Sequence, residues 1–439
     1  LALYAACVQA GFVYLPLNTA YTPQELNYFV ENSGAKVLVC DVVKSDALSP
    51  LARRLGIVLT TLDLAGQGQL QKEAQEASEH FVPVQRGPND LAAILYTSGT
   101  TGRSKGAMIS HRNLLSNAIS LKEAWCFGEQ DVLLHALPVF HTHGLFVATN
   151  IMLLAGGAMI FLPKFDLDII FAHLPRATTM MGVPTFYTRL LDDARLTVAS
   201  CAHMRLFVSG SAPLLNDTHA QFQERTGHAI LERYGMTETN MNTSNPYVGD
   251  RRPGTVGFPL PDVELKITDP KTGALVENGE IGQIEVRGAN VFQGYWNMPV
   301  RTREELRDDG FFITGDLARR DKEGYIHIVG RNKDLIISGG YNIYPKEIET
   351  LLDEQTGVDE SAVVGLPHPD FGEMPVAFLV LKPGAQVDLS KIDIFIADQL
   401  ARFKHPKKLI VLDELPRNTM GKVQKNLLRE NYKDLFAGR

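Results

Sequence analysis

Short apolar runs that alternate with helical patterns constrain the fold of this 439-residue chain more than any other feature. Examples are the runs 35–41 (AKVLVCD), 91–99 (LAAILYTSG), 158–163 (AMIFLP) and 204–211 (MRLFVSGS). Apolar strands separated by helices are typical of layered α/β folds with buried, largely parallel sheets. The sequence therefore predicts an α/β protein with a large core, which its 45% apolar residues can fill.

Strict alternation of apolar and polar residues sets in over 263–267 and again over 282–288. This pattern predicts half-exposed antiparallel strands in a small β-barrel-like subdomain, with a further hairpin over 317–329. A compact α+β pattern of strand, glycine loop and helix follows. The sequence thus predicts two domains, a large one over 1–331 and a small C-terminal one over 332–439.

Charge and cysteine content exclude several classes of protein. Lys and Arg number 43 against 50 Asp and Glu, which argues against a chain that mainly binds nucleic acid or an anionic membrane. The four cysteines form no CxxC pair, so we expect reduced thiols and a cytoplasmic or organelle-interior location. The apolar run 145–163 is broken by Gly156 and Gly157, which predicts helix, turn and strand instead of a membrane span.

The first residues form an apolar helical pattern from Leu1 to Gly11, with neither Met nor a helix cap. We expect strands of the large domain to be missing before residue 1, and an exposed sheet edge where they belong. Such a loss would weaken the large domain, so a non-catalytic nucleotide binder is one alternative for this chain.

The most specific local motif is YTSGTTGRSKG over 96–106, directly after a predicted buried strand. A loop of hydroxyls, glycines and cations can turn backbone N–H groups and Lys105 toward phosphate oxygens. It is not a Walker A loop, because the residue five after Gly99 is Ser104 and a glycine follows Lys105. A polar turn that caps a helix near 110–118 is the alternative.

A second motif, ERYGMTET over 232–239, places Tyr234, Thr237 and Glu238 on one short segment. The carboxylate of Glu238 offers Mg²⁺ the oxygen ligand that this ion prefers. By itself the motif is weak, and an ordinary helix entry capped by Thr237 is the alternative.

Two further motifs lie closer to the C-terminus. Asp316 ends the run 311–316 (FFITGD), and Arg331 follows fifteen residues later. A carboxylate at a strand end suits two ribose hydroxyls, although an isolated Gly-Asp more often marks a turn. Lys422 ends the run 415–422 (LPRNTMGK), where a lysine without further context is a solvated tail residue.

In this order and spacing, the four motifs resemble the adenylate-forming superfamily, which includes acyl-CoA synthetases, firefly luciferase and the adenylation domains of peptide synthetases. The resemblance covers about 11–432. Within the superfamily, the segments 137–150, 183–191, 205–214 and 232–246 are most similar to bacterial malonyl-CoA synthetases. It implies a large α/β domain and a small, mobile α+β C-terminal domain. It also implies ATP, Mg²⁺ and coenzyme A, with an acyl-AMP intermediate whose AMP the CoA thiol displaces.

The resemblance implies the following roles. The catalytic residues are Lys422, Thr237 at the α-phosphate, and Glu238, which also holds Mg²⁺. Nucleotide binding falls to Thr97, Ser98, Gly99, Thr100, Thr101 and Lys105 for the phosphates, Gly210, Ser211, Ala212 and Tyr234 for adenine, and Asp316 and Arg331 for ribose. His141 lines the acyl pocket, Arg189 binds a second carboxylate, Ser338, Gly339 and Gly340 meet coenzyme A, and Lys333 is the hinge.

The expected reaction is malonyl-CoA synthesis, with other acids as alternatives: methylmalonate, a medium-chain fatty acid or an aryl acid. Arg189 is the reason for favouring a diacid, since an alkanoate pocket would be apolar; a snorkelling helix arginine is its alternative. The expected partners are small molecules, with no nucleic acid and no membrane span. Lys422 is also a candidate for acylation by a modifying enzyme.

Overall fold

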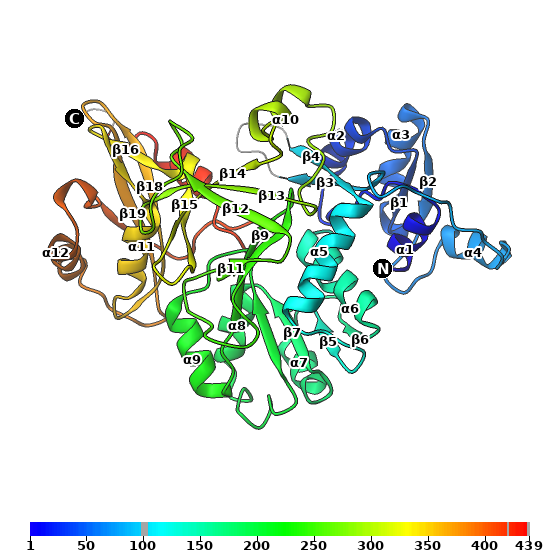
Figure 1. The fold of residues 1–439 in the computed structure, drawn as a ribbon, viewed down its shortest axis with the longest axis horizontal. Helices are drawn as coiled ribbons and strands as arrows, with labels where there is room; N and C mark the ends of the chain where they lie inside the picture. Colours follow the sequence, from blue (N-terminus) through cyan, green and yellow to red (C-terminus); the bar gives the residue numbers. More distant parts are fainter. Residues whose placement is uncertain (98–103, 419–420, 437–439) are drawn as a thin grey trace.

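The computed structural model describes residues 1–97, 104–418 and 421–436 of the chain (Figure 1). In Figure 1 the N-terminal elements (blue) and the C-terminal elements (orange and red) lie at opposite ends of the molecule, and two sheets lie between them. The site motifs come from these two intervening sheets and from the segments that flank them.

A central sheet holds seven strands, in the order β11 (Phe258–Pro259), β10 (Asn240–Ser244), β9 (Leu231–Met236), β8 (Leu206–Ser209), β7 (Thr179–Gly182), β5 (Val132–His135) and β6 (Ala158–Phe161). The strands from β9 to β6 are parallel, whereas β10 and β11 pair antiparallel. The parallel strands predicted at 158–163 and 204–211 are therefore confirmed.

Helices pack on both faces of the central sheet, because successive strand residues point to opposite sides. On one face Leu133 and Val208 form a core with α5 (His111–Ala124) and α6 (Thr149–Ala155). On the other face Leu134 and Phe207 form a core with residues of α7 (Leu167–His173), α8 (Pro184–Leu191) and α9 (Asn216–Thr226). This two-sided burial explains why these strands read as continuous apolar runs.

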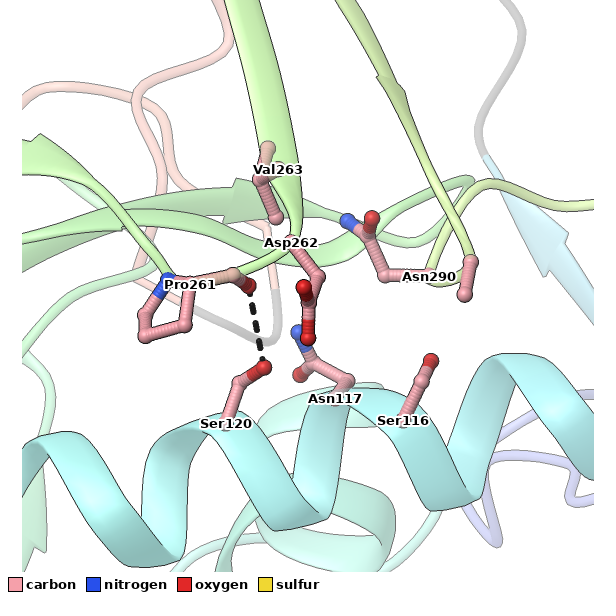
Figure 2. Close-up of a pocket in the computed structure, with 8 residues that line it drawn as sticks. Ser116, Asn117, Ser120, Pro261, Asp262, Val263 and Asn290 are labelled. Atoms are coloured by element: carbon pink, nitrogen blue, oxygen red, sulfur yellow. Dashed lines mark hydrogen bonds between the residues drawn. The ribbon is translucent and has the colours of Figure 1, made fainter.

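Helix α5 begins with a capping box between Ser110 and Asn113, so its cap is separate from the glycine-rich loop at 96–106. Figure 2 shows the polar niche of about 10 Å³ where α5 meets the segment before β12 (Val263–Thr268). There the Ser120 hydroxyl donates to the Pro261 carbonyl at 3.1 Å. The niche has room for about one water molecule.

The run 91–99 departs from the predicted parallel pattern. It forms β3 (Leu91–Thr97), which pairs antiparallel with β4 (Lys105–Ser110), because the glycine-rich segment leads into a second strand instead of a helix. The run 35–41 contains β1 (Val37–Cys40), which pairs parallel with β2 (Val58–Thr61), as expected. The N-terminal helices are α1 (Ala2–Gln9), α2 (Pro23–Ser33), α3 (Ser45–Leu55) and α4 (Gln69–Glu76).

A four-stranded antiparallel sheet confirms the alternation seen in the sequence. Its order is β12, β13 (Gly282–Gly288), β14 (Phe312–Arg320) and β15 (Ile326–Arg331). Helix α10 (Pro299–Glu305) lies between β13 and β14 in the chain and beside the β3–β4 hairpin in space (Figure 1). The last strand ends at Arg331, one of the predicted site residues.

The C-terminal region is an α+β unit whose apolar clusters contain residues from 336 onward. Its sheet consists of β17 (Tyr341–Ile343), β16 (Ile336–Ser338), β19 (Gly372–Leu381), β18 (Val358–His368) and β20 (Leu409–Leu412). Its helices are α11 (Pro345–Asp353), α12 (Leu389–Gln399) and α13 (Lys425–Tyr432). Separate packing supports the predicted domain division after residue 331, which stays a prediction.

Short helical turns complete the fold: η1 (Val42–Lys44), the π-helical η2 (His143–Ala148), η3 (Leu174–Arg176), η4 (Asn332–Asp334) and η5 (Arg402–Lys404). The apolar run 145–163 spans most of η2, all of α6, the predicted glycine turn and β6. Within the described parts of the chain, no helix is long and apolar enough to cross a membrane.

Candidate active site

The second and third motifs meet where the central sheet borders the antiparallel sheet. Asp316 and Arg331 are register partners on β14 and β15, and Arg331 Nε lies 2.9 Å from Asp316 Oδ1. The hydroxyl of Tyr234 on β9 donates to Asp316 Oδ2 at 2.7 Å. Burial, then the Asp316 charge, raises the pKa of Tyr234 well above its usual value. The fold thus brings together the ring, carboxylate and guanidinium predicted for adenosine.

Gly210, Ser211 and Ala212 form the turn that follows β8, next to Tyr234 on the neighbouring strand. A Cβ atom on Gly210 would lie 2.3 Å from Cζ of Arg233, so a larger residue here would force the arginine side chain to move. Ser211 has a positive φ of 71°, and its Oγ lies 3.3 Å from His143 Nδ1. The predicted adenine turn therefore covers a buried arginine.

Of the residues predicted to bind phosphate, Thr97 and Lys105 are register partners at the end of the β3–β4 hairpin. Lys105 Nζ lies 3.3 Å from Glu305 and 4.1 Å from the ring centroid of Tyr295. The Tyr295 hydroxyl is 2.9 Å from Glu238 Oε1. The other predicted phosphate residues, which lie outside the described part of the chain, are Ser98, Gly99, Thr100 and Thr101.

Thr237 and Glu238 lie in the hairpin loop between β9 and β10, so the alternative of a helix entry is wrong. Glu238 is 5% exposed; burial raises its pKa, while Tyr295 and the positive charge of Lys105 lower it. Among the described residues, no three His, Cys, Asp or Glu side chains gather to hold a metal. A single buried carboxylate fits Mg²⁺, which commonly takes its remaining ligands from phosphate oxygens and water.

Lys422 reaches the same site from the C-terminal region. Its loop approaches α8, since a Cβ atom added to Gly421 would be in ordinary van der Waals contact with Thr185, at 3.7 Å. Lys422 itself is solvent-exposed. Desolvation by the surrounding protein, followed by the charge of Arg331, lowers its pKa to about 8, while Asp316 raises it. Lys422 is therefore close enough to the Asp316–Arg331 pair for both charges to act on its pKa.

A second cation, Arg233 on β9, is 4% exposed. Its Nε and Nη2 atoms have no hydrogen-bond partner among the described residues. Burial lowers its pKa to about 9, so it is still cationic at pH 7. Burial, then the charges of Arg233 and Lys422, lowers the pKa of His141 to about 4. His141 is therefore neutral and lies near both cations.

Arg189 lies in the last turn of α8 and is exposed. Phe186 and Tyr187 of this helix face Gly182 on the sheet, whereas the Arg189 side chain faces solvent. This position does not support the predicted pairing of Arg189 with a buried carboxylate. Among the residues that the structure describes, Arg233 is the buried arginine without an ion-pair partner.

The residues predicted for coenzyme A lie within the C-terminal region. Gly339 and Gly340 have φ values of 54° and 84° and form the tight turn between β16 and β17, which is the simple-turn alternative. The Gly339 N–H donates to the Phe371 carbonyl at 2.9 Å, and Ser338 is buried beside them. Lys333 lies in η4, the short helical turn that begins at the residue after Arg331. Within the described part of the chain, the structure shows no contact of Ser338, Gly339 or Gly340 with Lys422, whereas the charge of Lys333 is, after burial, one of those that lower the Lys422 pKa.

Sequence reasoning overlooked Arg233, Tyr295 and Glu305. Arg233 carried a usable signal, because a charged residue within an otherwise buried strand needs a partner or a ligand. Glu305 meets Lys105 across 200 positions of the chain, and no local pattern reveals such a contact.

Comparison with known proteins agrees with this geometry. The model of the AMP-binding enzyme family matches residues 1–296, and that of the AMP-binding enzyme C-terminal domain matches 347–422. A malonate–CoA ligase of Arabidopsis thaliana is 36% identical, over 97% of this chain and 75% of its own length. A mitochondrial malonate–CoA ligase of Mus musculus is 36% identical over 96% and 78%. A long-chain-fatty-acid–CoA ligase of Bacillus subtilis is 34% identical over 97% and 82%.

Solved structures of MatB from Rhodopseudomonas palustris share 60% sequence identity with the chain and cover 99% of it and 86% of their own length. The TM-score is 0.97 for the ATP-bound form and 0.84 for the apo form. These matches confirm the predicted adenylate-forming fold. With a family model over most of its length and relatives above 30% identity over nearly all of it, the chain belongs to the AMP-binding enzyme family.

Proposed function

We propose that this chain is an ATP-dependent malonate–CoA ligase, which converts malonate, ATP and CoA to malonyl-CoA, AMP and diphosphate. The observation that carries the proposal is the buried, unpaired Arg233. Beyond the effect of burial, the charges of Arg233 and Lys422 both lower the pKa of His141, so the two cations lie near this histidine. A short diacid has two carboxylates, one for Arg233 and one for Lys422. The malonate–CoA ligases among the relatives support the same assignment.

Adenylation requires a carboxylate to attack the α-phosphorus of ATP, so two anions must approach each other. A pair of unit charges 4 Å apart interacts by about 4 kcal/mol at an effective dielectric near 20. Lys422 lowers this repulsion by contacting the attacking carboxylate and the α-phosphate together. Thr237 donates its hydroxyl to the same phosphate, and Asp316 with Arg331 orients the ribose.

The β- and γ-phosphates face Thr97 and Lys105 at the mouth of the hairpin. The same role is proposed from the sequence motif for Ser98, Gly99, Thr100 and Thr101. Glu238 would hold Mg²⁺, which supplies positive charge to the phosphate oxygens when bound. Gly210, Ser211, Ala212 and Tyr234 frame the adenine. With these groups in place, bond formation at the α-phosphorus releases diphosphate and leaves malonyl-AMP.

Thioester formation follows when the CoA thiol attacks the malonyl carbonyl and AMP departs. In this structure Lys422 lies at the site, while Ser338, Gly339 and Gly340 do not. We infer that the region 332–439 rotates about Lys333 relative to 1–331 between the two steps. Rotation withdraws Lys422 and brings the glycine turn in, where a pantetheine arm can pass close to the backbone.

Lys422 is also the residue at which we propose modification by an acylating enzyme. Lys422 is exposed, and a pKa of about 8 leaves part of its amine uncharged and nucleophilic near neutral pH. Acylation there would remove the charge and block adenylation, which makes Lys422 a regulatory target.

The four cysteines, all described, are unpaired, which supports a reducing compartment. We propose the cytoplasm, with the mitochondrial relative as a reason to test the location.

The proposal is tested by diphosphate release with malonate, methylmalonate, acetate, octanoate and benzoate, each with ATP and Mg²⁺. Malonate should exceed acetate by on the order of 10⁴ in kcat/KM, because acetate leaves the buried guanidinium unpaired. Methylmalonate keeps both carboxylates and should be the nearest competitor. Equal turnover of octanoate or acetate would contradict a diacid substrate.

Substitution of the two candidate arginines identifies the one that binds the distal carboxylate. Arg233→Met should lower kcat/KM for malonate by about 10³ or more, and reduce its preference over acetate. Arg189→Met, on the exposed face of α8, should stay within about twofold of wild type. Removing an unpaired buried cation should leave the melting temperature of Arg233→Met unchanged or raised. The reverse pattern of activities would restore Arg189 as the partner.

Lys422→Ala should separate the two half-reactions. Diphosphate release should fall by about 10³ or more, because the charge that bridges the two anions is gone. Conversion of supplied malonyl-AMP and CoA to malonyl-CoA should remain near the wild-type rate. Equal loss in both assays would contradict the assignment of Lys422 to adenylation alone.

The pKa of Lys422 predicts the alkaline limit of adenylation. The cationic form is the active one, so kcat/KM for MgATP, which reports the pKa of the free enzyme, should hold below pH 8 and fall as pH rises through about 8. Lys422→Arg keeps its charge, so whatever activity it retains should lack this decline. A decline at the same pH in both proteins would assign it to another group.

A further inference from the structure

Glu305, the last residue of α10, accepts contacts from three side chains at the proposed phosphate end of the site. Its carboxylate oxygens lie 3.3 Å from Lys105 Nζ, 2.5 Å from an Arg301 guanidinium nitrogen and 2.6 Å from the Tyr295 hydroxyl. The side chains of Glu305 and Lys105 are only 16% and 17% exposed. An ion pair within one helix end would need only the Arg301–Glu305 contact, so the contacts of Glu305 with Lys105 and Tyr295 call for another explanation.

Tyr295 extends these contacts to the residue proposed for Mg²⁺. Its hydroxyl lies 2.9 Å from Glu238 Oε1, and its ring lies beneath the Lys105 ammonium at 4.1 Å. The Glu305 carboxylate thus contacts Lys105, the cation proposed to bind phosphate, directly. It is linked to Glu238, the residue proposed to bind Mg²⁺, through the hydroxyl of Tyr295. Lysine has a long, flexible stem, so such contacts decide where its charge lies before a ligand arrives.

We propose that Glu305 is a positioning residue for adenylation, which holds Lys105 by an ion pair and Glu238 through Tyr295. The inference rests on the proposed roles of Lys105 and Glu238 toward MgATP. Groups held in place before binding stabilise charge without reorganising during the reaction. Glu305 therefore acts on nucleotide binding and the first half-reaction, and not on transfer to CoA.

The test is Glu305→Gln, which keeps the shape of the side chain and removes its charge. KM for MgATP should rise by on the order of tenfold and kcat of diphosphate release should fall a few-fold. Malonyl-CoA formation from supplied malonyl-AMP should stay within about twofold. The matched control is Glu304→Gln, because Glu304 is 56% exposed and contacts Arg301 at 3.0 Å. It should leave all these constants unchanged.

A double substitution separates positioning from general packing. Because part of its effect runs through Lys105, Glu305→Gln should cause a smaller loss in a Lys105→Met background than in the wild-type protein, the remainder being its effect on Glu238. The same loss in both backgrounds would overturn the inference, as would a Glu305→Gln protein with wild-type constants.

Two further measurements keep a folding defect apart from this role. Glu305→Asp should recover part of the MgATP affinity, and the melting temperature of each variant is measured beside its activity. A Glu305→Gln protein that melts early and loses both half-reactions equally would show a structural residue and overturn the proposal. MgATP binding by equilibrium dialysis without any acid still reports on Glu305, so a failure of malonate as substrate would contradict the proposed function alone.

Discussion

Two negatively charged molecules must meet in this enzyme, and the rest of the site depends on how positive charge is kept available for them. Arg233 is buried and unpaired, and Lys422 has its pKa lowered to about 8 by its surroundings. A buried cation without a partner destabilises the empty protein. Its presence on a central strand makes sense where a ligand supplies the missing anion. The same cost that disfavours Arg233 in the empty site favours a substrate carboxylate over water.

The other cations of the site are handled differently. Lys105 is already paired with Glu305, and Arg331 with Asp316. Both belong to the part proposed to bind nucleotide, where ATP would bring several charges and hydroxyls at once and could compete with an existing pair. The acyl end receives one small anion, which cannot displace a carboxylate already bound to Arg233. The number of charges on each ligand therefore explains why Lys105 and Arg331, proposed to bind ATP, are paired, whereas Arg233, proposed to bind the acid, is unpaired.

Local pattern was enough to predict the layered α/β core and the antiparallel strands after residue 262, whereas the assignment of the motifs to one site came from the resemblance of all four to a family. The core and the strands depend on properties of neighbouring residues: apolar periodicity, strict alternation and turn chemistry. The β3–β4 hairpin was missed because a strand followed by a glycine-rich segment looks alike whether a helix or a strand comes next. Arg189 was chosen on the resemblance, and Arg233 was overlooked although its place within an otherwise buried strand was a usable signal. Glu305 could not be found, since its contact with Lys105 exists only in three dimensions.

The position of Lys422 joins the fold to the order of the two reactions. Its loop is tied to the C-terminal region by ion pairs of Arg417 with Glu360 and of Lys425 with Glu349. Helix α13, which follows it, is tied by Arg429 to Asp334 in the segment after Arg331. Since all these anchors lie beyond residue 331, a rotation near Lys333 can carry the loop away without breaking them. Lys422 meets the large region through a close approach at Gly421 and through charge, both of which are readily given up once the acyl-AMP has formed.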